Sequence, residues 1–215
     1  IMKEKTLTWI VGIIAVALVS SILLIIFYSG PDRYEYGGPG GTYQFIYAKS
    51  KSADVYFNYM TVFIQDQEYI VPLRHSPYEV ESIPLDLRAR DEVLVHGFDS
   101  RWMKTQVLFT QSPDLAGLTD QGSVLAVNQM DLILNTDGLY GFKTFRGFTT
   151  SPTDDPNYET ITCRDATVTH SVIEFRYGEP SIFVEEENCV VVQGNSKESI
   201  MAATDKLIMH FVGVF

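Results

Sequence analysis

The feature that most constrains this chain is an uncharged stretch near its beginning, Leu7–Gly30, which reads LTWIVGIIAVALVSSILLIIFYSG. As a helix that rises about 1.5 Å per residue, the part from Trp9 to Tyr28 is about 30 Å long, which matches the hydrocarbon core of a bilayer. Aromatic residues stand at both of its ends, as is typical at membrane interfaces. A helix in a soluble core would carry a polar stripe, whereas only two serines interrupt this one. We therefore expect residues 1–30 to form a transmembrane anchor that contacts the lipid bilayer through residues 9–28.

Two other fates of this segment stay open. A signal peptide ends in small residues, and Ala15-Val16-Ala17 has that form, but cleavage there would leave a second apolar stretch at the new terminus. A pilin-like subunit also carries a long apolar N-terminal helix ahead of a β-rich head. No Lys-Gly or Arg-Gly processing site lies between Lys3 and Trp9. The sequence therefore favours an uncleaved, single-pass anchor.

The distribution of charge predicts the side of the membrane on which the rest of the chain lies. Lys3 and Lys5 precede the span, and basic residues beside a span tend to stay in the cytoplasm. The formal net charge of the chain is −11 at pH 7, and all of this acidity lies in residues 31–215, because residues 1–30 hold two lysines and one glutamate. We expect a protein of the cell membrane with a cytoplasmic N-terminus and its C-terminal domain outside. Such acidity argues against nucleic acid or anionic lipid as a partner.

Beyond the anchor, the chain is predicted to consist of a spacer and a domain. Residues 31–42, PDRYEYGGPGGT, are rich in glycine and proline and favour a flexible spacer. Residues 43–215 have the length of one ordinary domain or of two small ones. If they divide, the expected subdomains lie at about 43–150 and 151–215.

Short apolar and aromatic runs predict a domain rich in sheet. Tyr43, Phe45 and Tyr47 alternate with polar residues, which is typical of a half-buried strand. Val55–Ile64 is apolar on both faces and suits a central strand, with residues 68–73 as its hairpin partner. The other expected strands lie at residues 92–97, 105–110, 139–145, 158–162, 172–177, 181–184 and 189–193, and a turn at Gly178–Pro180 is expected to join two of them as a hairpin.

The first of two expected amphipathic helices runs from Gln121 to Leu134, with Asp120 as its cap. Two separated helices among strands indicate an α+β fold, and we expect a sheet with the helices packed on one of its faces. The expected architecture is thus an N-terminal transmembrane helix followed by a sheet-rich extracytoplasmic domain.

The second amphipathic helix is expected to close the chain. Asn195 is its expected N-cap, and Glu198 stands three residues later, as in a capping box. Lys206 falls beside the apolar stripe of this helix, where a substitution is expected to cost little stability. The stripe itself consists of Ile200, Ala203, Leu207, Ile208 and Phe211.

Parts of this pattern resemble a known group of proteins. TCRDAT at residues 162–167, a hairpin, NCVVVQG at 188–194 and a helix containing ATDKLIMHFVG at 203–213 together look like the C-terminal part of uncharacterised single-pass membrane proteins from archaea. YIVPLRHSPYEVESIPLD at residues 69–86 is similar to a segment in the middle of the same group. The resemblance implies an anchored, outward-facing protein and implies no activity.

Searches for catalytic and metal-binding patterns yield no candidate site. The four histidines are far apart in the sequence, and no nucleophile elbow, zinc-protease, P-loop or dinucleotide motif occurs. Asp154, Asp155 and Asn157, like Glu185–Glu187, offer oxygen ligands without the spacing of an EF-hand, and we interpret them as solvated acidic turns. Asp165 is interpreted as a turn or cap residue. We expect no catalytic residue, cofactor or metal.

Tyrosine is concentrated early in the domain, since eight of the twelve tyrosines lie within residues 34–78. Tyr43, Tyr47, Tyr56 and Tyr59 are the candidate binding face, because exposed tyrosines on a sheet bind glycans, peptides or neighbouring subunits well. The alternative, which the sequence favours, is that tyrosine suits strands and lines the edge of the core.

Cys163 and Cys189 are the only cysteines, and both lie in the part expected outside the cell. An even number of cysteines in an oxidising compartment predicts a disulfide. Two buried free thiols, or a redox or metal-binding pair, remain as alternatives.

Three functions from different classes are consistent with these features. The expected one is a membrane-anchored extracytoplasmic module of the cell envelope that performs no catalysis and serves as a binding, scaffold or accessory subunit, with an envelope protein or a glycan as its partner. The alternatives are an anchored hydrolase whose site is dispersed in the sequence and a pilin-like filament subunit.

Overall fold

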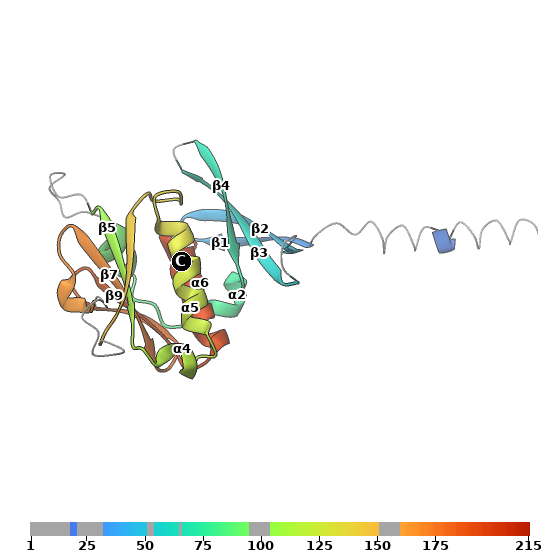
Figure 1. Cartoon of the computed structure of the whole chain (residues 1–215). Helices are drawn as coiled ribbons and strands as arrows, with labels where there is room; N and C mark the ends of the chain where they lie inside the picture. Colours follow the sequence, from blue (N-terminus) through green and yellow to red (C-terminus); the bar gives the residue numbers. More distant parts are fainter. Residues whose placement is uncertain (1–17, 21–31, 51–53, 65, 95–103, 151–159) are drawn as a thin grey trace, which may run out of the picture.

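The structure is a computed structural model of the chain. It describes residues 18–20, 32–50, 54–64, 66–94, 104–150 and 160–215. Within these residues, two sheets lie on either side of two long helices (Figure 1). This arrangement confirms the α+β class predicted from the sequence.

No helix within the described residues has the length and apolar character that crossing a bilayer requires. Apart from residues 18–20, the expected span at residues 9–28 falls outside the described part of the chain. The transmembrane anchor at residues 1–30 therefore stays a prediction.

The first sheet is an antiparallel meander with the strand order β1-β2-β3-β4. Its strands are β1 (Asp32–Gly38), β2 (Gly41–Lys49), β3 (Tyr56–Ile64) and β4 (Gln67–Leu73). Alternation along the strands directs Phe45, Met60 and Leu73 into the core, where each is fully buried. The expected strands that begin at residues 43, 55 and 68 are confirmed as β2, β3 and β4.

The flexible spacer expected at residues 31–42 is wrong, because its described part is a paired hairpin. Gly38 pairs with Gly41 at the end of β1 and β2, and Gly41 has a φ of 128°, which favours glycine. A Cβ atom added to Gly38 would lie 2.0 Å from the carbonyl oxygen of Val214. The glycines therefore serve a tight turn and a close backbone approach, and sequence composition alone does not separate these uses from flexibility.

The second sheet is mixed and has the strand order β6-β5-β7-β9-β8. Its strands are β5 (Gln106–Gln111), β6 (Lys143–Phe148), β7 (His170–Tyr177), β8 (Ser181–Glu186) and β9 (Cys189–Gly194). β5 is parallel to both β6 and β7, β7 is parallel to β9, and β8 is the antiparallel edge. A subdomain boundary near residue 150 would cut through this sheet, so the expected division into 43–150 and 151–215 is wrong.

Two connections in this sheet differ from the expected ones. β7 and β8 follow each other along the chain but do not pair, because β9 lies between them, so Gly178–Pro180 is not a hairpin turn. The strand expected at residues 158–162 is reduced, among its described residues, to a bridge between Thr160 and Phe148. The strand expected at 139–145 begins only at Lys143.

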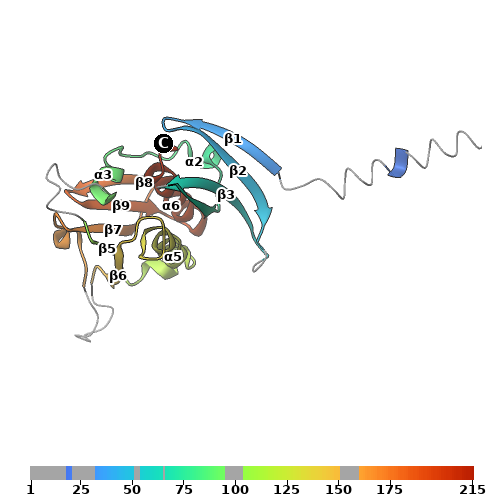
Figure 2. The ribbon, with the colours of Figure 1, turned by 90° about the horizontal axis from the view of Figure 1, so that it is seen from above.

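The helices occupy the space between the sheets, as the two views in Figures 1 and 2 show for α5 and α6. Their bounds are α2 (Pro77–Val80), α3 (Ala89–Leu94), α4 (Leu115–Leu118), α5 (Gly122–Leu134) and α6 (Lys197–Phe211). Core residues of the meander, of the mixed sheet and of both long helices form one apolar cluster. α6 therefore lies at the centre of the molecule, and the stripe expected from the sequence is fully buried.

Several local predictions fail at helices. The strand expected at residues 92–97 is wrong in its described part, which belongs to α3. Asp120 does not cap α5; instead, the side-chain oxygen of Thr119 accepts from the backbone N–H of Ser123 at 3.1 Å. At α6 the capping box consists of Ser196 and Ser199, one residue further along than expected.

The predicted disulfide is confirmed. Cys163 and Cys189 are bonded, with their Cα atoms 5.3 Å apart. The bond joins the 3-10 turn η1 (Cys163–Asp165) to β9 on the face of the mixed sheet that is remote from α6, within a small cluster of its own. Asp165 is a cap, as expected, since its carboxylate accepts from the backbone N–H of Thr162 at 2.7 Å.

Candidate functional site

The four candidate tyrosines do not share one face. Tyr47 lies on the same side of β2 as the buried Phe45, whereas Tyr59 lies on the opposite, outer side of the sheet beside Phe57. The hydroxyl of Tyr43 donates to the carbonyl oxygen of Val212 at 3.2 Å. Tyr43 therefore has a structural contact with the end of the chain, and Tyr59 belongs to a different surface.

Tyr47 and Tyr56 do come together. Their rings stack with centroids 5.2 Å apart and planes inclined by 20°. The two residues are 41% and 51% exposed, respectively, because they stand on the core-facing side of the meander beyond the part that the helices cover. Both tyrosines belong to the candidate set named from the sequence, and their rings are the two members of it that stack.

The stacked pair lines an open cavity of about 380 Å³. The other residues around it are polar or amphipathic, namely Asp32, Tyr34, Asn58, Arg74, Ser76 and Glu79. Both signs of charge are thus present beside two exposed aromatic rings. Ligand sites typically combine aromatic walls with a few polar groups in this way.

Hydrogen bonds hold the polar wall of the cavity in place. Tyr34 donates its hydroxyl proton to Asn58 Oδ1 at 2.8 Å, and Asn58 Nδ2 donates to the carbonyl oxygen of Arg74 at 3.3 Å. Burial raises the pKa of Tyr34, so the hydroxyl stays protonated and remains a donor. The Glu79 carboxylate accepts from both the backbone N–H and the hydroxyl of Ser76.

A buried carboxylate next to the cavity fixes the end of β4. Asp205 of α6 is fully buried, and its Oδ2 accepts from the backbone N–H groups of Arg74 and His75 at 3.0 and 2.8 Å. The same oxygen lies 2.8 Å from Nδ1 of His75, and Oδ1 accepts from Gln129 Nε2 at 2.5 Å. The carboxylate therefore links the meander, α5 and α6, and it sets the position of Arg74 in the cavity wall.

The protonation of this pair follows from its contacts. Burial alone would lower the pKa of His75, but the hydrogen bond from His75 to Asp205 and the charge of that carboxylate raise it overall. Burial raises the pKa of Asp205, whereas its hydrogen bonds with His75 and Gln129 act in the opposite sense. The groups that contact Asp205 can all donate hydrogen bonds to it, which favours an ionised carboxylate against the effect of burial.

Sequence reasoning missed this pair. His75 stands in a stretch interpreted as an irregular connection, and Asp205 stands within a predicted helix whose apolar stripe does not include it. The one local indication of the pair is an aspartate inside a helix that is otherwise mostly apolar. The contact itself joins His75 and Asp205, which are 130 residues apart, so no local pattern predicts it.

A second polar cluster lies beside the disulfide. Arg176 donates to Glu174 Oε1 at 2.5 Å and to both oxygens of Glu185, and both carboxylates lie within about 3.5 Å of the sulfur of Cys163. Among the described residues, this cluster has the ligand types of a metal site. However, the sulfur of Cys163 is bonded to Cys189, and the Arg176 guanidinium group already pairs with both carboxylates, so the cluster is better explained as an ion-pair network over the disulfide.

Comparisons of the chain with models of protein families, with curated proteins and with solved structures give no match.

Proposed function

We propose that this chain is a membrane-anchored extracytoplasmic binding module of the cell envelope, and that it binds an envelope glycan through the cavity beside Tyr47 and Tyr56. The observation that carries the proposal is the exposed, stacked pair of tyrosines in a cavity with polar walls. The anchor at residues 9–28 would hold the cavity close to the membrane, because β1 begins at Asp32.

The chemistry of the cavity favours a sugar. Tyrosine rings offer apolar faces to the C–H groups of a pyranose ring, and their hydroxyl groups remain available for hydrogen bonds. Asp32 and Glu79 supply carboxylates at the same cavity, which suits a ligand with many hydroxyl groups. Such a ligand needs no deep apolar pocket, and this cavity is open.

Two further features support a location outside the cytoplasm. The disulfide between Cys163 and Cys189 is of a kind that persists in oxidising compartments. Lys3 and Lys5 precede the uncharged stretch, which by the positive-inside rule favours an N-terminus in the cytoplasm.

A hydrolase is the alternative that a specific observation favours, namely the pair His75 and Asp205. Such a pair needs a nucleophile within reach of the imidazole. Ser76 is adjacent in the sequence, but its hydroxyl donates to Glu79 at 2.8 Å, and His75 Nε2 instead lies 3.5 Å from Glu198. The contacts around this pair among the described residues are those of a structural link, so binding is the better proposal.

The test is a glycan-binding measurement on the full chain in detergent micelles. An array of envelope-type oligosaccharides is screened first, and the best ligand is titrated by calorimetry. Tyr47→Ala and Tyr56→Ala should each weaken its binding at least tenfold without changing the melting temperature appreciably, since both side chains are largely exposed. Tyr177→Ala is the matched control, because Tyr177 is 55% exposed at the other sheet. Absence of any sugar ligand, or equal loss in all three variants, would contradict the proposal.

A further inference from the structure

The two hairpins of the meander separate at one end. The pairing of β2 with β3 stops at Phe45 and Met60, although β2 begins at Gly41 and β3 continues to Ile64. All residues of both strands over this length belong to the described part of the chain. Figure 1 shows β3 and β4 rising away from β1 and β2 there. A gap therefore opens between two strands of the same sheet.

Alternation identifies the backbone groups that face this gap. In an antiparallel pair, successive residues direct their N–H and C=O groups to opposite sides of the strand. Gly38 and Gly41 form the last pair of the β1–β2 hairpin, so the backbone N–H and C=O of Gly41 point toward β1. The backbone N–H and C=O groups of Thr42 and Gln44 therefore point toward β3.

The same reasoning applies to the other wall. The closing pair Ile64–Gln67 uses the groups of Ile64 toward β4, so Phe63 and Thr61 direct theirs toward β2. Phe45 and Met60 direct their own backbone groups away from each other, so their pairing already engages the neighbouring Gln44 and Thr61. Beyond that point, the backbone groups of Thr42 on one wall and of Phe63 on the other are not used by the pairing of β2 with β3. Such open strand edges are templates for another extended chain.

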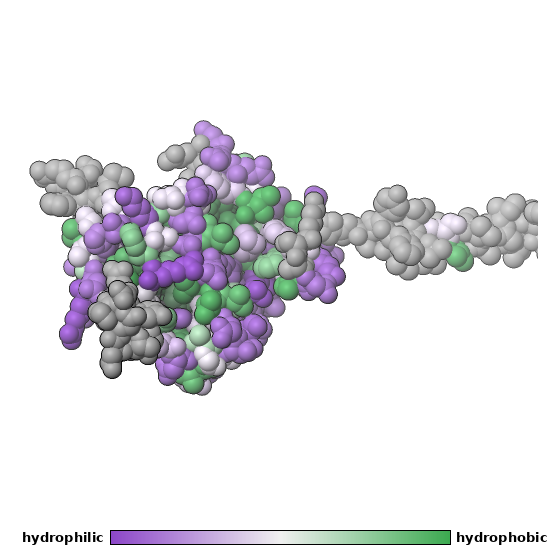
Figure 3. Space-filling view, in the orientation of Figure 1, coloured by the Kyte–Doolittle hydropathy of each residue, from purple (hydrophilic) through white to green (hydrophobic). Residues whose placement is uncertain are grey.

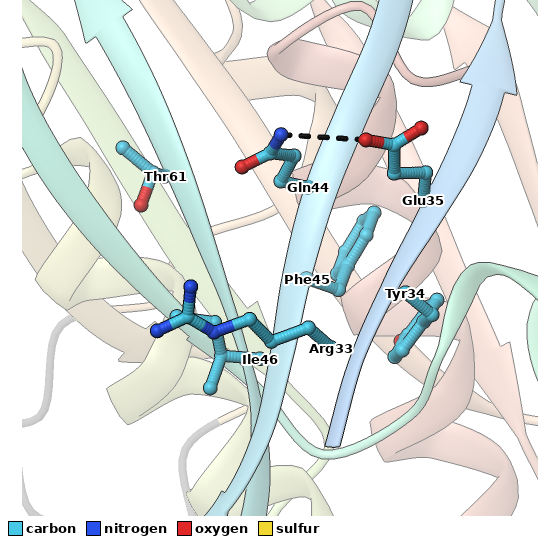
Figure 4. A pocket seen from close by; sticks show the side chains of 7 residues that line it. All are labelled: Arg33, Tyr34, Glu35, Gln44, Phe45, Ile46 and Thr61. Carbon is cyan, nitrogen blue, oxygen red and sulfur yellow. Dashed lines mark hydrogen bonds between the residues drawn. The ribbon is translucent and has the colours of Figure 1, made fainter. Parts of the chain in front are cut away.

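The gap is hollow as well as open. A cavity of about 590 Å³ lies between Thr42–Gln44 on β2 and Thr61–Phe63 on β3, with Glu68 and Val212 completing its lining. A second hollow of about 520 Å³ shares Gln44 and Thr61 with the first and continues across β1 and β2 (Figure 4). Figure 3 shows apolar side chains where the β3–β4 hairpin crosses β2, between hydrophilic surfaces.

Contacts at the end of the chain hold the gap open. The backbone N–H of Gly40 donates to the carbonyl oxygen of Gly213 at 3.0 Å, and the Tyr43 hydroxyl donates to that of Val212. These bonds tie the β1–β2 turn to the segment after α6. A movement of this turn toward β3 would therefore break them.

We propose that this gap, the β2–β3 groove, accepts an extended, basic segment of a partner protein by strand addition. The segment pairs with the open backbone of Phe63, and strand addition of this kind is a recurring mode of peptide recognition. Alternate side chains of the segment meet the apolar surface of Val62 and Val212 on one side and the Phe63 ring, which is 71% exposed, on the other.

Charge determines which occupant fits. Glu68 lines the groove itself, and Glu35 lines the adjoining hollow, where its carboxylate accepts from Gln44 at 3.3 Å. Arg33 is the one cation among the residues that line the two hollows, and the chain as a whole carries −11. A second copy of this chain would bring like charges together, whereas lysine or arginine residues in a partner segment complement these carboxylates.

The test uses the full chain in detergent micelles and a synthetic heptapeptide of alternating lysine and valine as the probe. Binding should slow hydrogen exchange at the amide of Phe63, measured by NMR or mass spectrometry. A peptide of the same sequence with N-methylated backbone amides keeps the charge and loses the donors, so it should bind at least tenfold more weakly. Equal binding of the two peptides, or protection elsewhere only, would overturn the proposal.

Two variants separate the backbone from the side chain. Phe63→Pro removes the N–H that faces the groove and leaves the pairing with β4 intact, so peptide binding should be lost. Phe63→Ala keeps that N–H and should weaken binding only two- to fivefold. Equal effects of these variants would mean that the ring alone carries the interaction and would refute strand addition. Self-association of the chain in the absence of peptide, abolished by Phe63→Pro, would refute the hetero-partner assignment.

Discussion

Lys206 is a charged residue that is buried because its ammonium group has hydrogen-bond acceptors inside the fold. It is only 4% exposed, and its Nζ donates to the carbonyl oxygens of Glu81 and Ile83 at 2.7 Å each. The ammonium group also lies 4.6 Å from the centre of the Phe215 ring. The expectation that a substitution here costs little is therefore wrong, because the helical pattern places Lys206 beside the apolar stripe but does not show which segment covers it.

The contacts of Lys206 lead to a stability prediction. Lys206→Asp should lower the free energy of unfolding by about 3–5 kcal/mol, because it places a carboxylate against two carbonyl oxygens in a buried site. Leu207→Asp should cost a similar amount, since Leu207 is fully buried. Lys197→Ala, at a half-exposed position of the same helix, is the control and should change stability by less than about 0.5 kcal/mol. Denaturant unfolding of the full chain in micelles measures all three, and a small effect at Lys206 would contradict the observed contacts.

The pair His75 and Asp205 predicts a pH dependence of stability. The pKa of His75 is raised in the folded chain relative to its ordinary value of 6.5, so the protonated form is favoured by folding. This contribution is complete below about pH 6.5 and is lost as the pH rises through the folded-state pKa. The melting temperature should therefore fall as the pH rises above about 6.5, and His75→Gln should flatten that slope. An unchanged slope in the variant would show that other groups carry the dependence.

At the scale of elements, local patterns predicted the secondary structure of each segment better than its position in the fold. Alternation of apolar residues correctly predicted β2, a run that is apolar on both faces correctly predicted β3, and amphipathic spacing correctly predicted α5 and α6. The strand order β6-β5-β7-β9-β8 depends on contacts between distant segments, which no local pattern contains. The same limit applies to the candidate site. Tyrosine density indicated Tyr47 and Tyr56, but the polar wall around them comes from β1, β3 and the end of β4.

The β1–β2 hairpin, which replaces the expected spacer, gives an element-scale prediction. Gly38→Ala should destabilise the fold by about 2–4 kcal/mol, because the new Cβ would lie 2.0 Å from the carbonyl oxygen of Val214. Gly37→Ala is a matched control one residue away, since a Cβ there meets no atom within 4 Å. In a flexible spacer the two changes would be equally harmless. Thermal unfolding of the two variants distinguishes the hairpin from a spacer.

At the scale of the whole molecule, charge and covalent structure support the same proposed location. The acidity of the chain lies beyond residue 30, and the disulfide joins two segments of the mixed sheet region that are 26 residues apart. Closing such a loop contributes about 3.5 kcal/mol in the chain-entropy model. A thiol-rich cytoplasm would remove that contribution, whereas an extracytoplasmic position preserves it. The stability of the domain and the proposed topology are therefore linked.

The last prediction tests that topology directly. Protease added to intact cells should digest the domain and leave a short fragment that contains residues 9–28, because we propose that Lys3 and Lys5 keep the N-terminus in the cytoplasm. In chain isolated without reducing agent, Cys163 and Cys189 should resist alkylation after unfolding and react once reduced, since both sulfurs are in the disulfide. The two measurements are separate, but a reversed orientation would contradict both predictions. The domain would then be cut only after lysis, and both cysteines would be alkylated without reduction. If the domain resists protease while the disulfide is intact, an envelope layer outside the membrane shields the domain. Permeabilising that layer alone should then make the domain sensitive to protease.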